Sequence, residues 1–216
     1  MLPARPFFLI RHGETVMNAK RLFCGGGVDT ELNAEGRRQA FDVTKVLDAM
    51  PAHQRPTLIV HSDMVRTRQT TEILNSSLNL PVMADHDLRE QMMGEWEKLP
   101  WSETLPLLHS GAKPKGGESR AEFGARVRTA FIRVLSNHAG ERILIVGHGG
   151  TFHALQLIHG VDRRVFIPNA TLHRFAPEPA HAPMPWRITY YRWKNALRED
   201  TAPICPSADA ARTIYG

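Results

Sequence analysis

Long apolar runs and cysteines are both scarce in this sequence, and each shortage excludes a class of protein. No apolar run approaches the ~20 residues that a transmembrane helix needs, and the N-terminal Met-Leu-Pro-Ala-Arg-Pro enters the core pattern too soon for a signal peptide. The only cysteines, Cys24 and Cys205, form neither a metal-ligand pattern nor a disulfide framework. We therefore expect a cytoplasmic protein without membrane contact, and we interpret both thiols as inert.

Positive charge is present, but no segment concentrates it. The formal net charge is +5, while the lysines and arginines are scattered and form no basic stripe along a helix. The sequence also lacks zinc-finger spacing and aromatic-basic ribonucleoprotein strands. We predict no nucleic-acid partner, because small anionic substrates explain the charge equally well.

Apolar runs and helix signals alternate along the chain. Helical periodicity begins after Asn33, after Ser62 and Asp63, at the Ser119–Glu122 capping box and near Thr151. Runs typical of strands are Pro6–Ile10, Thr57–Val60, Pro81–Leu88, Arg142–Val146, Thr171–Phe175 and Trp186–Trp193. This alternation predicts an α/β fold, a three-layer sandwich whose mostly parallel, doubly wound sheet is flanked by helices.

The length of 216 residues suits one such domain. We expect a single domain over residues 1–195, with an irregular lid at about residues 90–117 because prolines and a Gly-Gly pair interrupt that segment. Periodicity is lost beyond Trp193, so residues 196–216 are predicted to be a surface tail.

Polar side chains follow the predicted strands where each strand ends. Arg11 and His12 follow the first strand, Arg66 lies just beyond the second, Glu90 follows the third, and His148 follows the run Arg142–Val146. Parallel sheets bind ligands at the carboxyl ends of their strands, so these residues are expected to share one rim.

Two histidines, two arginines and a carboxylate suffice for metal-free phosphoryl transfer. Arginines bind phosphate oxygens as bidentate forks, an imidazole attacks phosphorus, and a carboxylic acid protonates the leaving oxygen. Strand-end glycines such as Gly149 let the backbone approach an anion closely. No metal-ligand cluster accompanies these strand ends, so no metal or other cofactor is predicted. The residues alone do not distinguish His12 from His148 as nucleophile, and Arg68 competes with Arg66.

The run Arg11-His12-Gly13-Glu14-Thr15, followed by Asn18, resembles the signature of the histidine phosphatase, or phosphoglycerate-mutase-like, superfamily. The resemblance continues through Ser62–Thr70, Leu88–Glu90, Gly117-Glu118-Ser119 and Gly147-His148-Gly149. It implies His12 as the transiently phosphorylated nucleophile, Glu90 as proton donor, and a phosphate pocket formed by Arg11, Arg66 and His148, with Thr15 and Asn18 lining the same pocket.

The resemblance leaves three functions to compare. A phosphatase passes the phosphoryl group to water, whereas a cofactor-dependent phosphoglycerate mutase returns it to a bound sugar acid. A third possibility is a phosphate-binding module without turnover. The segment from Glu90 to His148 is shorter than the substrate-covering insertion of the mutases, which favours a phosphatase acting on a small phosphate ester.

The sequence leaves the substrate itself open. Phe23, Met92, Met93 and Trp101 are candidates for an apolar wall, and Lys20, Arg21, Arg89 and Lys98 are candidates for binding a second acidic group. Phosphoglycerate-like acids, sugar phosphates and α-ribazole phosphate all agree with these residues.

Overall fold

The computed structural model describes residues 1–161, 166–180, 183–193 and 196–201. Cys205 and most of the predicted tail lie outside them. The described part contains a seven-stranded sheet in the order β3-β2-β4-β1-β5-β6-β7. Strands β3 (Val82–Asp85), β2 (Leu58–Ser62), β4 (Ile143–Gly147) and β1 (Phe7–Arg11) run parallel, and β5 (Leu172–Pro177), β6 (Trp186–Trp193) and β7 (Leu197–Thr201) extend the sheet as antiparallel neighbours.

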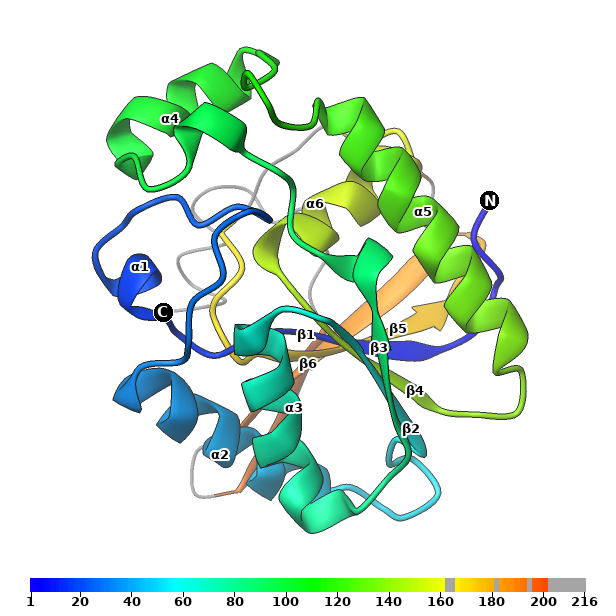
Figure 1. Cartoon of the computed structure of the whole chain (residues 1–216). Helices are drawn as coiled ribbons and strands as arrows, with labels where there is room; N and C mark the ends of the chain where they lie inside the picture. The colour runs from blue at the N-terminus through cyan, green and yellow to red at the C-terminus, as the bar shows by residue number, and fades with distance from the viewer. Residues whose placement is uncertain (162–165, 181–182, 194–195, 202–216) are drawn as a thin grey trace.

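Helices cover both faces of this sheet (Figure 1). On one face α5 (Arg120–Asn137) and α6 (Gly149–Ile158) pack against Phe7 and Leu9, and on the other α2 (Ala34–Ala49) and α3 (Val65–Leu78) pack against Phe8 and Ile10. Successive side chains of a strand point to opposite faces, so β1 is buried on both sides. The predicted α/β sandwich with a mostly parallel sheet is confirmed.

Two of the predicted helix starts are confirmed by their caps. The side chain of Asn33 accepts a hydrogen bond from Gly36 N, and Ser119 forms a capping box with Glu122. The start of α3 was predicted at Ser62 or Asp63, and this is wrong. Helix α3 follows Met64, and its first N–H, on Val65, donates to the carboxylate of Asp29. A residue far away in the sequence therefore provides the cap.

The structure also corrects two segments that were predicted to be irregular. The lid region contains the short 3-10 helix η2 (Gly94–Trp96) and the helix α4 (Trp101–His109), which includes Pro106. Just before the lid, the predicted strand run Pro81–Leu88 ends in another 3-10 helix, η1 (His86–Leu88). Buried contacts of Leu108 with Met93 and Trp96 hold α4 in place. Residues 197–201, assigned to the tail, form β7 by pairing with β6.

A further short helix, α1 (Val16–Ala19), follows β1. Figure 1 shows α1, α4 and the first turn of α6 around the carboxyl ends of the parallel strands. Within the described ranges, no helix has the length and apolarity needed to cross a membrane.

Candidate functional site

The carboxyl ends of β1, β2 and β4 bring the predicted site residues together. Arg11 ends β1, Arg66 lies on the first turn of α3, and His148 is the N-cap residue of α6. The rings of His12 and His148 are 5.3 Å apart between centroids. Arg11, His12, Arg66 and Glu90 line one cavity of about 360 Å³, together with Asn18 and Gly149.

The imidazole of His12 is held in one tautomer. Its Nδ1 lies 2.7 Å from the carbonyl oxygen of Gly13, and because a carbonyl only accepts hydrogen bonds, Nδ1 carries the proton. Burial and, next to it, the positive charges of Arg66 and Arg11 lower the pKa of His12 well below 6.5. The ring is therefore neutral at pH 7, with an unprotonated Nε2.

His148 has the opposite tautomer. Arg66 donates from Nε to Nδ1 of His148 over 3.3 Å, and since Nδ1 accepts, the proton of the neutral ring lies on Nε2. This Nε2 is buried and has no partner among the described residues. Burial, followed by the charge of Arg66, also lowers the pKa of His148 well below 6.5.

The two arginines are held by backbone carbonyls. Arg66 is 1% exposed and donates to the carbonyl oxygens of Val28 (3.0 Å) and Gly25 (2.9 Å). Arg11 donates from Nη1 to the carbonyl oxygen of Ile167 (2.6 Å), while its buried Nε has no partner in the described part of the chain. Burial lowers the pKa of Arg11 to about 10, which still leaves it charged at neutral pH.

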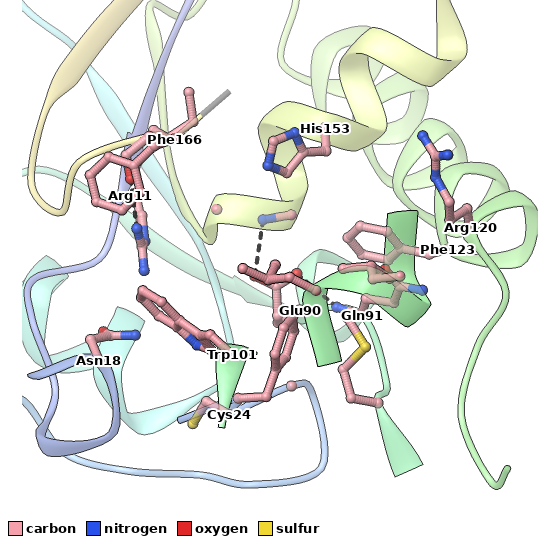
Figure 2. A pocket seen from close by; sticks show the side chains of 18 of the residues that line it. Arg11, Asn18, Cys24, Glu90, Gln91, Trp101, Arg120, Phe123, His153 and Phe166 are labelled. Atoms are coloured by element: carbon pink, nitrogen blue, oxygen red, sulfur yellow. Dashed lines mark hydrogen bonds between the residues drawn. The ribbon is translucent and has the colours of Figure 1, made fainter. Parts of the chain in front are cut away.

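Glu90 lies at the cavity with both carboxylate oxygens bound to backbone N–H groups. Its Oε2 accepts from Gly150 N (3.0 Å) on the first turn of α6, and its Oε1 accepts from Gln91 N (2.8 Å). Figure 2 shows the first of these bonds and places Glu90 between Trp101 and Gln91. The other nearby carboxylates, those of Glu14, Glu95 and Glu97, do not line the cavity.

Thr15 and Asn18 have different roles from each other. Thr15 is fully buried, caps α1 and donates its hydroxyl to Asn18 Oδ1 (3.1 Å), so it orients Asn18 instead of lining the cavity. Asn169, which sequence reasoning missed, donates to the carbonyl oxygen of His12 (2.9 Å) and faces Asn18 Oδ1 at 3.4 Å. With its oxygen occupied, Asn18 presents its amide N–H groups to the cavity.

Only part of the predicted specificity set reaches the cavity. Phe23, Met93 and Trp101 line it, whereas Met92 does not. None of the four predicted cations lines it either: Arg89 pairs with Asp63 at 2.5 and 3.0 Å, and Lys20, Arg21 and Lys98 are exposed elsewhere. Arg68, the competitor of Arg66, is exposed and also lies outside.

Several lining residues were not recognised in the sequence. They come from α4, which was not predicted, and from positions that carry no motif. They include Gln91, Leu105, Leu108, His109, Arg120, Phe123, His153, Leu157, Phe166 and Ile167. The apolar periodicity of α5 indicated that Phe123 is buried, but no sequence signal placed it at the site.

The helix-flanked sheet matches the phosphoglycerate mutase-like fold of the structural neighbours. A family model, histidine phosphatase superfamily (branch 1), matches residues 7–181. The chain therefore belongs to the histidine phosphatase superfamily.

Relatives and solved structures agree with this assignment. The chain is 36% identical over 182 residues to a "Probable phosphoglycerate mutase GpmB" of Yersinia enterocolitica, covering 77% of this chain and 82% of the relative. It is 34% identical over 159 residues to "Phosphoglycerate mutase-like protein 4" of Arabidopsis thaliana, covering 68% and 67%. A mycobacterial glucosyl-3-phosphoglycerate phosphatase solved with VO3 superposes with a TM-score of 0.71 at 25% identity, covering 93% and 98% of the two chains. The α-ribazole phosphatase of Shigella flexneri gives 0.68 at 26%, covering 88% and 97%.

Proposed function

We propose that this protein is a phosphomonoester phosphatase that works through a phosphohistidine on His12. The observation that carries the proposal is a pair of buried N–H donors, Arg11 Nε and His148 Nε2, that have no acceptor among the described residues. Buried donors are nearly always paired in native proteins, so the two unpaired ones, on Arg11 in the cavity wall and on His148 beside His12, support a bound acceptor at this site. A phosphate dianion provides acceptor oxygens and suits the adjacent charge of Arg66.

The two tautomers favour His12 over His148 as nucleophile. His12 donates from Nδ1 to Gly13, which leaves a lone pair on Nε2, whereas the Nε2 of His148 carries a proton. Attack on phosphorus needs the lone pair, and binding a phosphate oxygen needs the proton. This assignment uses the hydrogen bonds of each ring and is independent of the family resemblance.

Glu90 is proposed as the acid and then the base. In the first step the Nε2–P bond forms while the bond from phosphorus to the ester oxygen breaks, and Glu90 gives its proton to that oxygen. In the second step the ionised Glu90 takes a proton from water, whose oxygen displaces His12 from phosphorus. Two backbone N–H groups, of Gln91 and Gly150, stabilise the ionised carboxylate that links the steps.

A mutase is the second candidate, because the two sequence relatives described above are named for mutase activity or likeness. The short segment between Glu90 and His148 and the phosphatase titles of the structural neighbours support water as the acceptor. The substrate of this proposal is a small phosphate ester, turned over without a metal or other cofactor.

Rapid quenching of the enzyme with a ³²P-labelled ester tests these proposals. We expect acid-labile, base-stable label on the peptide containing His12, release of inorganic phosphate, and no label in His12→Ala. Turnover should persist in EDTA. Label that moves to 3-phosphoglycerate without phosphate release would establish the mutase, label on the peptide of His148 would reverse the two histidines, and phosphate binding without turnover would indicate a binding module.

A further inference from the structure

The cavity continues beyond the phosphate-binding groups into an apolar chamber, which we define as the space lined by Phe23, Trp101, Leu105, Phe123, Leu157 and Phe166. These side chains come from the loop after α1 and from α4, α5, α6 and the segment before β5. Figure 2 shows the rings of Trp101 and Phe123 on either side of Glu90, the proposed donor to the leaving group, and the ring of Phe166 beside Arg11. The leaving group of a bound ester therefore lies among apolar side chains.

The size of the cavity also bears on the leaving group. About 360 Å³ is within the range of sites that enclose a whole organic ligand, and it exceeds the needs of a phosphate with a three-carbon chain. A small leaving group leaves the rings of the chamber exposed to water, whereas a larger apolar one displaces that water. Burial of apolar surface favours the larger group.

The four cations that were predicted to bind a second acidic group of the substrate, Lys20, Arg21, Arg89 and Lys98, do not line the cavity. Of these, Arg89 is bound to Asp63 outside the cavity. Arg120 does line the cavity, and Figure 2 shows it across the space from Arg11, beyond Phe123. A carboxylate two carbons from the phosphorus would lie among the aromatic rings, where burying an unpaired charge is costly.

We infer that the preferred substrate is a phosphomonoester with an apolar leaving group, an extended alkyl chain or an aromatic ring, and not a phosphoglycerate. The expected order of kcat/KM values rests on the proposed function, whereas the expected order of binding affinities does not depend on turnover. Each methylene buried in the chamber should raise kcat/KM about fourfold, until the chamber is filled.

The test uses alkyl phosphates from methyl to hexyl and 3-phosphoglycerate, all of which have alkoxide leaving groups and so share the same chemistry. We expect kcat/KM to rise with chain length and 3-phosphoglycerate to be a poorer substrate than butyl phosphate. The matching alkyl phosphonates, which cannot be hydrolysed, should show the same rise in affinity by calorimetry. A flat or falling series in both measurements, or a preference for 3-phosphoglycerate, would overturn the inference.

The phosphonates separate this inference from the proposed function. If no ester is hydrolysed while phosphonate affinity rises with chain length, the phosphatase proposal fails and the apolar chamber stands. If esters are hydrolysed without regard to chain length, the phosphatase stands and the chamber has no role in selection.

Helix α4 offers a matched pair of variants. Leu105 lines the chamber, whereas Leu107 on the same helix is 43% exposed and lies outside it. Leu105→Asn should reduce the dependence of kcat/KM and of phosphonate affinity on chain length, and Leu107→Asn should leave the whole series unchanged. Equal effects of the two variants on the series would contradict the assignment, and circular dichroism with thermal unfolding shows whether each variant is folded.

Discussion

Arg66 donates from Nε to Nδ1 of His148, and this one hydrogen bond determines what the imidazole can do. Because Nδ1 accepts, the ring proton lies on Nε2, where it is buried without a partner in the described structure. Arg66 therefore has two functions: its guanidinium lines the cavity as a cation, and it orients the proton of its neighbour. A lysine supplies a charge but not the fork that contacts His148 and the carbonyls of Val28 and Gly25 together.

For this reason Arg66→Lys should lower kcat/KM by about 10²-fold or more, which is the usual loss of rate when one oriented hydrogen-bond donor is removed from an active site. Its affinity for inorganic phosphate should fall as well. Arg68→Lys, on the exposed side of the same helix, is the matched control and should be neutral. Steady-state kinetics and phosphate titration measure both effects. Equal kcat/KM values and equal phosphate affinities of the two variants would show that Arg66 does not act in catalysis or phosphate binding.

Glu90→Gln should slow the hydrolysis of an alkyl phosphate by ~10²-fold or more, because the amide cannot give a proton to a poor leaving group. p-Nitrophenyl phosphate, whose leaving group needs little protonation, should be affected less. The side-chain oxygen of the glutamine can still accept from Gly150, so substrate affinity should be retained.

The exposed Glu95 in the same segment provides the control for this prediction, as Glu95→Gln. Equal losses on both esters in Glu90→Gln would exclude Glu90 as the acid. Glu14 and Glu97 are poor replacements, because they accept hydrogen bonds from Asn33 Nδ2 and from Gly27 N, outside the cavity.

The stability of the fold should decrease as the pH falls below 6.5. Burial lowers the pKa of His173 to about 4, so the folded protein keeps this ring neutral where the unfolded chain binds a proton. The stabilisation is complete above pH 6.5 and is lost toward pH 4, at about 1.4 kcal/mol per pH unit for one group. His12 and His148, also shifted downward, act in the same direction.

Urea unfolding between pH 7 and 5 measures this slope. His173 packs against Phe152 and Tyr190, so His173→Phe keeps an aromatic ring there and removes the titration. We expect a shallower slope in His173→Phe and an unchanged slope in His53→Gln, which alters an exposed residue. Identical slopes in the two variants would show that His173 does not contribute.

The parts of the fold that could be predicted are those determined locally. The run Phe7–Ile10 is apolar throughout because it is buried on both faces, and Asn33 and Ser119 cap helices that begin at the next residue. The start of α3 depends on Asp29, which reaches it only in the folded chain, and β7 depends on pairing with β6. Contacts of this kind join residues that are far apart in the sequence, so they leave no pattern in the residues next to the helix or strand.

The candidate site follows the same division. Arg11, His12, Arg66, Glu90 and His148 could be placed because strand ends of a parallel sheet share one edge. Arg89 could not be excluded from the sequence, because its engagement by Asp63 is a tertiary contact. The helix α4 was missed because its prolines indicated a loop, although packing of Leu108 on Met93 and Trp96 stabilises it.

Gly150 gives a test of Glu90 that leaves the carboxylate itself intact. A Cβ at this position would lie 1.9 Å from Glu90 Oε1, so Gly150→Ala must displace the carboxylate. We expect it to reproduce the pattern of Glu90→Gln, a large loss of activity on alkyl phosphates and a smaller one on p-nitrophenyl phosphate.

Gly124→Ala is the control, because a Cβ on this glycine of α5 meets no atom within 4 Å and alanine favours a helix by about 0.5–1 kcal/mol. Its activity should be unchanged and its melting temperature equal or higher. If Gly150→Ala lost activity equally on both esters, the displaced group would matter for binding and not for proton transfer, and the role proposed for Glu90 would have to be given up.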